Sequence, residues 1–226
     1  MFPGVRATGR SSLQLFYNMA QENKFPLILA SASPRRKELL QLAGIPLEVI
    51  PSRADERSLP GESPEEHVRR VARAKAVDVG RQHPGRWVLG ADTVVAIDRK
   101  ILGKPGGPSE AEEMLRALSH REHRVLTGFC ILRYPSPGER EGTIISRVKF
   151  KSLSEEEIRW YIRTGEPFDK AGGYAIQGRA AFMVEEILGS YTNVVGLPLC
   201  EVVEALRELG AVDLFGTQMN ADLMDS

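Results

Sequence analysis

The stretch that decides the fold reads Leu27-Ile28-Leu29-Ala30-Ser31-Ala32-Ser33-Pro34-Arg35-Arg36-Lys37-Glu38-Leu39-Leu40. Its first four residues are wholly apolar and follow a proline, which is typical of a short buried strand. Ser33 then offers a side-chain oxygen at an N-cap, and Pro34 fits the first helical position, where a missing N–H costs nothing. We therefore expect a strand over 27–30, a serine turn, and a helix over 34–43 that ends at Gly44.

Two arginines occupy the first turn of this predicted helix. A helix N-terminus carries partial positive charge and favours Asp or Glu there, so Arg35 and Arg36 are unusual. Together with Ser31, Ser33 and the free N–H groups, they offer several donors to an anion, as a phosphate site does. The alternative is two solvated arginines that point away from the protein. The combination of strand, serine turn and paired arginines favours phosphate.

The composition excludes several classes of protein. The 226 residues suffice for one sizeable core or two small lobes. The 30 basic and 30 acidic residues balance, which argues against nucleic-acid or membrane-surface binding driven by overall charge. The sequence contains no run of about eighteen apolar residues, so it predicts no transmembrane helix. Cys130 and Cys200 lie far apart in apolar patterns, which predicts reduced, buried thiols in a cytoplasmic protein.

The ends of the chain lack the pattern of the middle. Residues 1–24 have no continuous apolar run, so we expect a disordered leader rather than a secretory signal. The patterned part begins at Phe25, which suggests that translation starts at Met19; an intact Met1 on N-terminal sequencing of native protein would contradict this. We expect one domain of two lobes over 25–210 and a tail over 211–226.

The remaining patterns alternate between strands and helices. Capping boxes at Ser63, Ser109 and Ser154 predict three helix starts. Residues 190–196 are expected to form a loop, and a glycine-rich loop is expected over 165–178. Further strands are expected over 47–50, 87–97, 101–102, 124–134, 143–151 and 182–188, and a last helix over 198–209.

A carboxylate interrupts the strongest strand pattern. Asp92 lies within the apolar run 87–97, where an isolated ionised carboxylate is too costly unless it is paired, bound to metal or at a cleft. Gly90 and Ala91 beside it predict room for a ligand. The sequence therefore favours a functional role for Asp92.

Three further charges are candidates for the same site. Lys75 falls on the apolar stripe of the helix expected over 64–79, so it either snorkels to water or needs a buried carboxylate or a phosphate. Lys104, between Gly103 and Pro105, is either a loop-tip charge or a second phosphate cation, and its hairpin favours the latter. Glu56 follows a predicted strand and is otherwise an ordinary solvated charge.

The glycine-rich loop carries Asp169, Lys170 and Gln177. An amide presents both a donor and an acceptor, as the edge of a nucleobase does, although an ordinary glycine-rich turn is the alternative. Cations, carboxylates and an amide together suit a nucleotide phosphate, with Glu56 and Asp92 binding a hard divalent ion. No glycine-rich Walker loop is present, so the chain is not a P-loop enzyme.

Five segments, in order along residues 27–210, together resemble the Maf family of nucleoside triphosphate pyrophosphatases. They are Ser31-Ala32-Ser33-Pro34-Arg35-Arg36, Gly90-Ala91-Asp92-Thr93-Val94-Val95, Gly103-Lys104-Pro105, Asp169-Lys170-Ala171-Gly172 with Ile176-Gln177-Gly178, and Val195-Gly196-Leu197-Pro198. The resemblance implies a two-lobed, mixed-sheet α/β fold with a central cleft, related to the inosine triphosphatase fold. It also implies a cytoplasmic protein that is commonly a homodimer.

The same resemblance implies a reaction and a set of roles. Water attacks the α-phosphorus of a triphosphate with a divalent metal, usually Mg²⁺ with Mn²⁺ as the alternative, and releases pyrophosphate. Asp92 matches the family's proton acceptor. Arg35, Thr93 and Gln177 match positions tied to substrate choice, and Ser31, Glu56, Lys75 and Lys104 match the surroundings of the phosphates and metal.

Substrate choice follows from the branch that the chain resembles. Asp169-Lys170 and Gln177 resemble the branch that acts on dTTP and UTP, in a house-cleaning role that can extend to modified pyrimidines. The branch acting on 7-methyl-GTP typically has a carboxylate at the position of Gln177. A pyrophosphatase for 7-methyl-GTP or another modified nucleotide is therefore one alternative, and a non-catalytic nucleotide sensor linked to cell division is another.

Overall fold

The computed structural model describes residues 26–136 and 138–212. The leader expected over 1–24, the suggested start at Met19 and most of the expected tail lie outside these residues. The first two residues of that tail are described: Ala211 is buried, and Val212 packs against the same core. The folded part therefore reaches at least Val212.

A seven-stranded mixed sheet forms the centre of the molecule, which confirms the α/β class. β1 lies parallel to β2 and β3, whereas β3, β5, β6 and β7 pair antiparallel in that order and β4 pairs with the end of β3. The strands are β1 (Leu27–Leu29), β2 (Leu47–Val49), β3 (Trp87–Ile97), β4 (Lys100–Leu102), β5 (Glu122–Arg133), β6 (Glu139–Phe150) and β7 (Val184–Leu188).

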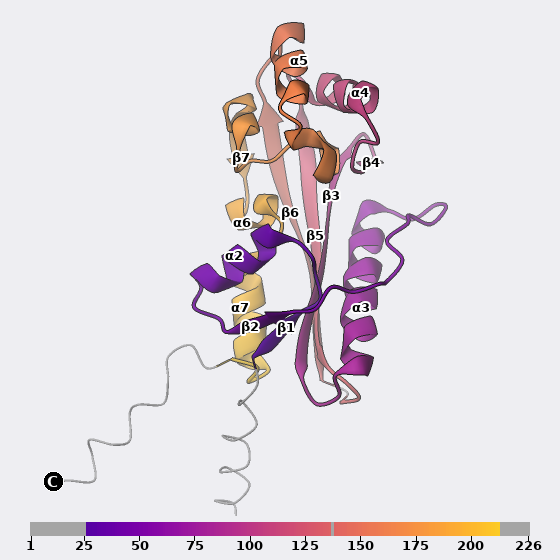
Figure 1. The fold of residues 1–226 in the computed structure, drawn as a ribbon, viewed down its shortest axis with the longest axis vertical. Coiled ribbons are helices and arrows are strands. Elements are labelled where there is room, and N and C mark those ends of the chain that lie inside the picture. The colour runs from indigo at the N-terminus through magenta and orange to yellow at the C-terminus, as the bar shows by residue number, and fades with distance from the viewer. Residues whose placement is uncertain (1–25, 137, 213–226) are drawn as a thin grey trace, which may run out of the picture.

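Helices cover both faces of this sheet and one of its ends (Figure 1). α3 packs on one face, α2 and α7 lie on the other, and α4 and α5 lie at the far end of the long strands. The helices are α2 (Pro34–Leu42), α3 (Pro64–Gln82), α4 (Pro108–Leu118), α5 (Glu155–Arg163), α6 (Tyr191–Val195) and α7 (Leu199–Glu208). Within the described part of the chain, none of them is long and apolar enough to cross a membrane.

On the face of the sheet opposite α3, two hydrophobic cores share the long strand β3. Leu89 and Ala91 pack with β1, α2 and α7 in one core, and Val95 and Ile97 pack with α4, α5 and the glycine-rich segment in the other. Asp92 and Thr93 lie between these two groups along the strand. The change from one core to the next therefore occurs at the residues that the sequence singles out.

The sheet edge beside these residues is open. β1 pairs with β3 only at Val88 and Leu89, and β4 pairs with it only from Val95 onward. Among the described strands, none covers this edge of β3 between the two pairings. A side chain can therefore reach the backbone here, and Arg36 Nη1 donates to the Ala91 carbonyl at 2.9 Å.

Two glycines let α3 lie close to the sheet. A Cβ at Gly90 would collide with the carbonyl oxygen of Ala72, and one at Gly128 would collide with that of Val68. The expectation that Gly90 leaves room for a ligand is therefore wrong, because the backbone of α3 fills that space. The close approach instead brings the side chains of α3 to Asp92.

Some predicted elements differ from the structure. Residues 191–195, expected to be a loop, form α6, whose first turn is capped by the Ser190 hydroxyl accepting from the Asn193 N–H. β7 begins at Val184 rather than at residue 182, because a 3-10 helix (Arg179–Met183) precedes it. The capping boxes at Ser63 and Ser154 are confirmed.

Three details of the predicted capping and burial are wrong. α4 begins at Pro108 after Gly107, so Ser109 lies inside the helix and does not cap it. Ser33 stands at the N-cap of α2, but its side chain makes no capping hydrogen bond. Cys130 is buried as expected, whereas Cys200 is exposed on α7 because it lies away from that helix's packed side.

A buried histidine predicts a pH dependence of stability. His123 lies in β5, packs on Phe150 and contacts the Tyr174 hydroxyl at 2.7 Å, and burial lowers its pKa to about 4. The unfolded chain therefore binds this proton more tightly, so stability is complete above about pH 6.5 and falls as the pH approaches 4. We expect this residue to account for a loss of about 3 kcal/mol between pH 7 and pH 4.

Urea unfolding at both pH values measures this loss. His123→Asn should remove it, whereas His120→Asn, at an exposed position, should retain it. Equal pH dependence in the two variants would contradict the assignment to His123.

Candidate functional site

A pocket of about 330 Å³ opens at the uncovered edge of β3. Residues from both cores, from the serine turn and from the glycine-rich segment line it. All twelve residues that the sequence indicated are among them, namely Ser31, Ser33, Arg35, Arg36, Glu56, Lys75, Asp92, Thr93, Lys104, Asp169, Lys170 and Gln177. The fold thus gathers in one place side chains that lie up to 146 positions apart in the sequence.

Two carboxylates converge on the ammonium group of Lys75. Its Nζ lies 2.9 Å from Asp92 Oδ1 and 2.9 Å from Glu56 Oε1. Lys75 and Asp92 are buried, whereas the Glu56 side chain remains 55% exposed at the pocket wall. Lys75 therefore does not snorkel to water, and Asp92 is paired, as the cost of burying a lone carboxylate requires.

A histidine that the sequence analysis missed contacts the second oxygen of Asp92. His67 Nε2 lies 3.6 Å from Asp92 Oδ2, and His67 Nδ1 lies 3.1 Å from Glu62 Oε2. Glu62 in turn accepts from Arg70, a hydrogen bond that lowers the pKa of Glu62 to about 2 despite its burial. Its position in the sequence could have indicated this role, because His67 precedes Lys75 by eight residues and lies on the same buried side of the helix.

Arg36 connects α2 to β3, to the serine turn and to the segment after α6 at the uncovered edge of β3. Its guanidinium donates to Gly196 O, Ser31 Oγ, Ala91 O and Thr93 Oγ1 at 2.8–3.0 Å. Burial lowers the pKa of Arg36, against the opposing effect of the Asp92 and Glu56 charges. These four bonds occupy most of its five donors, so Arg36 has less capacity than Arg35 to bind a phosphate.

Thr93 links α2 to the neighbouring strand β5. Its Oγ1 accepts from Arg36, contacts Thr127 Oγ1 at 2.9 Å and lies 3.2 Å from Gly196 O. Because Asp92 and Thr93 are consecutive in a strand, they project to opposite faces of the sheet. The open edge places both next to the same pocket.

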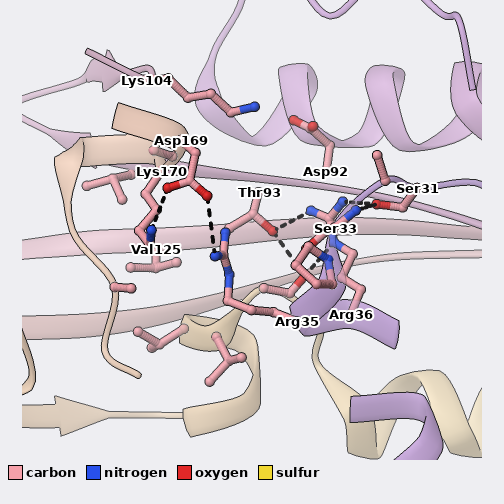
Figure 2. A pocket seen from close by; sticks show the side chains of 18 of the residues that line it. Ser31, Ser33, Arg35, Arg36, Asp92, Thr93, Lys104, Val125, Asp169 and Lys170 are labelled. Atoms are coloured by element: carbon pink, nitrogen blue, oxygen red, sulfur yellow. Dashed lines mark hydrogen bonds and ion pairs between the residues drawn. The ribbon is translucent and has the colours of Figure 1, made fainter. Parts of the chain in front are cut away.

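Charges from the two cores approach each other across the pocket, as Figure 2 shows. Arg35 Nη1 lies 4.0 Å from Asp169 Oδ2, and Lys170 Nζ lies 2.5 Å from Asp169 Oδ1. Burial raises the pKa of Asp169, but the hydrogen bond and charge of Lys170 outweigh it and lower the pKa overall. The long Arg35–Asp169 pair leaves the guanidinium able to turn toward an incoming anion.

Lys104 and Gln177 lie at the exposed rim. Figure 2 shows the Lys104 side chain extending over the pocket from the loop after β4. Within residues 26–136 and 138–212, Lys104 forms no ion pair, so its charge is available to an anion. Gln177 is exposed in the glycine-rich segment and lines the same pocket.

Another group of potential ligands lies outside the pocket. Cys130, Glu139 and Glu141 come within 4.8 Å of one another. Burial is the main cause that raises the pKa of the Cys130 thiol, and Arg73 pairs with both glutamates. A protonated thiol, and carboxylates already paired with an arginine, are poor ligands for a hard cation.

Comparison with known proteins settles the family. A sequence model of the family described as "Maf-like protein" matches residues 26–209. The chain belongs to this family. The matched range contains every residue named above as lining the pocket of this Maf-like protein.

Its relatives are similar over most of their length. A dTTP/UTP pyrophosphatase of Syntrophus aciditrophicus (strain SB) is 54% identical over 192 residues, which cover 85% of this chain and 94% of that protein. One of Geotalea uraniireducens (strain Rf4) is 56% identical over 190 residues, covering 84% and 98%. The Staphylococcus aureus Ham1 structure covers 55% of this chain and 71% of its own at 12% identity and a TM-score of 0.41, too distant to support a conclusion.

The pocket of this Maf-like chain divides chemically into two parts. Asp92, Glu56 and Lys75 form a carboxylate-rich part on the side of α3. Arg35, Lys104 and Lys170 supply positive charge on the side of the glycine-rich segment. Such an arrangement can hold a chain of phosphates with its cations and place a carboxylate beside one phosphorus atom.

Proposed function

We propose that this chain hydrolyses dTTP and UTP to the nucleoside monophosphate and pyrophosphate. The observation that carries the proposal is the convergence of Asp92 and Glu56 on Lys75, in a pocket shared with Arg35 and Lys104. Relatives at 54% and 56% identity that are called dTTP/UTP pyrophosphatases support the choice of substrate. The pocket volume falls in the range of small-molecule sites.

In this proposal, each side chain has a separate task. Asp92 accepts the proton of the water that attacks the α-phosphorus, and Lys75 holds that carboxylate in place through a 2.9 Å contact. Arg35 and Lys104 neutralise charge on the phosphates, which is the main requirement of phosphoryl transfer. Arg36 acts through the protein by fixing Ser31 and Thr93 at the pocket wall.

The residues fit a divalent cation. Glu56 and Asp92 already turn toward a common cationic group, and carboxylate oxygens are ligands that Mg²⁺ accepts alongside phosphate and water. We propose that these two residues hold Mg²⁺, with Mn²⁺ as a substitute. When bound, the metal neutralises phosphate charge and acidifies water.

The partners and the compartment are a further part of this proposal. We propose a cytoplasmic homodimer that binds a free nucleotide rather than a nucleic acid. Equal numbers of acidic and basic residues support the absence of nucleic-acid binding. The free Cys130 and Cys200 support a reducing compartment.

A pyrophosphate-release assay with Mg²⁺ and a panel of dTTP, UTP and 7-methyl-GTP tests the proposal. We expect the highest kcat/KM with dTTP and UTP. Preference for 7-methyl-GTP would indicate the other branch. Binding of every nucleotide without release would indicate a sensor and contradict the proposed hydrolysis.

Substitution of Gln177 tests base recognition. An amide pairs with a neutral pyrimidine edge through both a donor and an acceptor, whereas a carboxylate only accepts. Gln177→Glu should therefore lower kcat/KM for dTTP and UTP at least about tenfold, consistent with the loss of a paired polar contact. Gln41→Glu, an exposed change on α2, should leave it unchanged; equal values for both variants would remove Gln177 from the base site.

A further inference from the structure

Asp92 is held at both of its carboxylate oxygens by two residues of one helix. Lys75 Nζ contacts Oδ1 at 2.9 Å, and His67 Nε2 faces Oδ2 at 3.6 Å. The side-chain torsion of a carboxylate is broad and nearly two-fold, so one contact alone leaves it free to rotate. A proton on Nε2 makes His67 a partner for this carboxylate, and contacts at both oxygens then favour one orientation of Asp92.

Glu62 contacts His67 on the side of the ring away from Asp92. Its ring is buried, and Nδ1 lies 3.1 Å from Glu62 Oε2. Arg70 holds Glu62 through Nε at 2.5 Å and Nη2 at 2.9 Å, and the Leu59 N–H donates to the same carboxylate. A continuous polar chain thus runs from Arg70 through Glu62 and His67 to Asp92.

The same chain reaches the loop that carries Glu56. Arg70 Nη2 donates to the Arg57 carbonyl at 2.9 Å, one residue after Glu56. The first turns of α3 therefore contact both carboxylates that face Lys75, Asp92 through His67 and Glu56 through its loop. Packing of α3 close to β3, which Gly90 permits, makes these contacts possible.

We propose that His67 is a positioning residue, held by Glu62 and Arg70, that orients the Asp92 carboxylate for the hydrolysis. The inference rests on the proposed function, because it assigns a supporting group to the proton acceptor. His67 does not line the pocket, so it acts through Asp92 and not on the substrate. Misorientation of a reacting group costs rate more than substrate binding.

Kinetics of a matched set of variants test this role. His67→Phe keeps a ring and removes both nitrogens, and should lower kcat about tenfold with KM within about twofold. His67→Gln places an amide near the Nε2 position and should recover most of kcat. His83→Phe, at the other end of α3, should leave both constants unchanged.

A double-mutant cycle separates positioning from general destabilisation. In an Asp92→Asn background, His67→Phe should change kcat less than about twofold, because its effect passes through the carboxylate that is already lost. A full tenfold further loss in that background would overturn the inference. Normal kcat in His67→Phe would overturn it as well and leave the proposed function standing.

Nitrogen NMR of histidine-labelled protein gives a readout that does not depend on turnover. The His67 Nε2 resonance, assigned by its loss in His67→Phe, should move in Asp92→Asn and stay unmoved in Lys104→Ala. A resonance unmoved by Asp92→Asn would overturn the inference. Absence of pyrophosphate release by wild-type protein would overturn the proposed function, and the inference with it.

Discussion

Asp92→Asn is expected to lower kcat for pyrophosphate release from dTTP at least about a hundredfold, the scale of a lost general base. Asparagine has the same shape and retains an oxygen for Lys75, so the fold should persist. The variant loses the charge that accepts a proton and that binds a divalent cation. Initial rates at saturating dTTP and Mg²⁺, with unfolding curves for both proteins, measure the effect.

Asp98→Asn is the matched control. Asp98 is exposed in the turn after β3, where it pairs with Arg121 at 2.7 Å. Its backbone is left-handed, a conformation that asparagine adopts readily, so the variant should fold and turn over normally. A near-normal rate in Asp92→Asn would refute the role of this carboxylate.

Arg36→Met is expected to have the largest effect on stability. It removes four hydrogen bonds and leaves the carbonyls of Ala91 and Gly196 buried without this donor. The free energy of unfolding should fall by about 3 kcal/mol or more, as when buried polar groups lose a charged partner. Chemical denaturation of the two proteins measures the difference.

The neighbouring arginine provides the contrast. Arg35 makes a 4.0 Å, partly exposed pair with Asp169, so Arg35→Met should change stability by less than about 0.5 kcal/mol. It should instead raise KM for dTTP at least about tenfold, because a phosphate contact is worth more than about 1.4 kcal/mol. Equal stability losses in Arg35→Met and Arg36→Met would contradict the separate roles of the pair.

Local rules predicted much of the fold and several of the charged residues that line the pocket. Asp92 was recognisable because a buried carboxylate violates the pattern of its own strand. Lys75 was recognisable for the same reason on a helix. Ser63 and Ser154 cap helices through contacts within four residues, which a sequence displays directly.

The features that the sequence did not predict depend on distant partners. His67 looks like an ordinary helix residue until α3 packs on β3. The space beside Gly90 is filled by a helix and not by a ligand, and Arg36 reaches Gly196, 160 positions away. Residues 191–195 contain poor helix formers, and α6 forms there because Asn193 and Val195 become buried.

Hydrolysis of dTTP in ¹⁸O-labelled water tests the central claim most directly. ³¹P NMR of the products distinguishes attack at the α-phosphorus from attack at the terminal phosphate. We expect pyrophosphate without label and thymidine monophosphate carrying ¹⁸O, with at least about a hundredfold slower formation of labelled product by Asp92→Asn. Release of labelled orthophosphate, or nucleotide binding without any labelled product from the wild-type protein, would contradict the proposed role of the pocket.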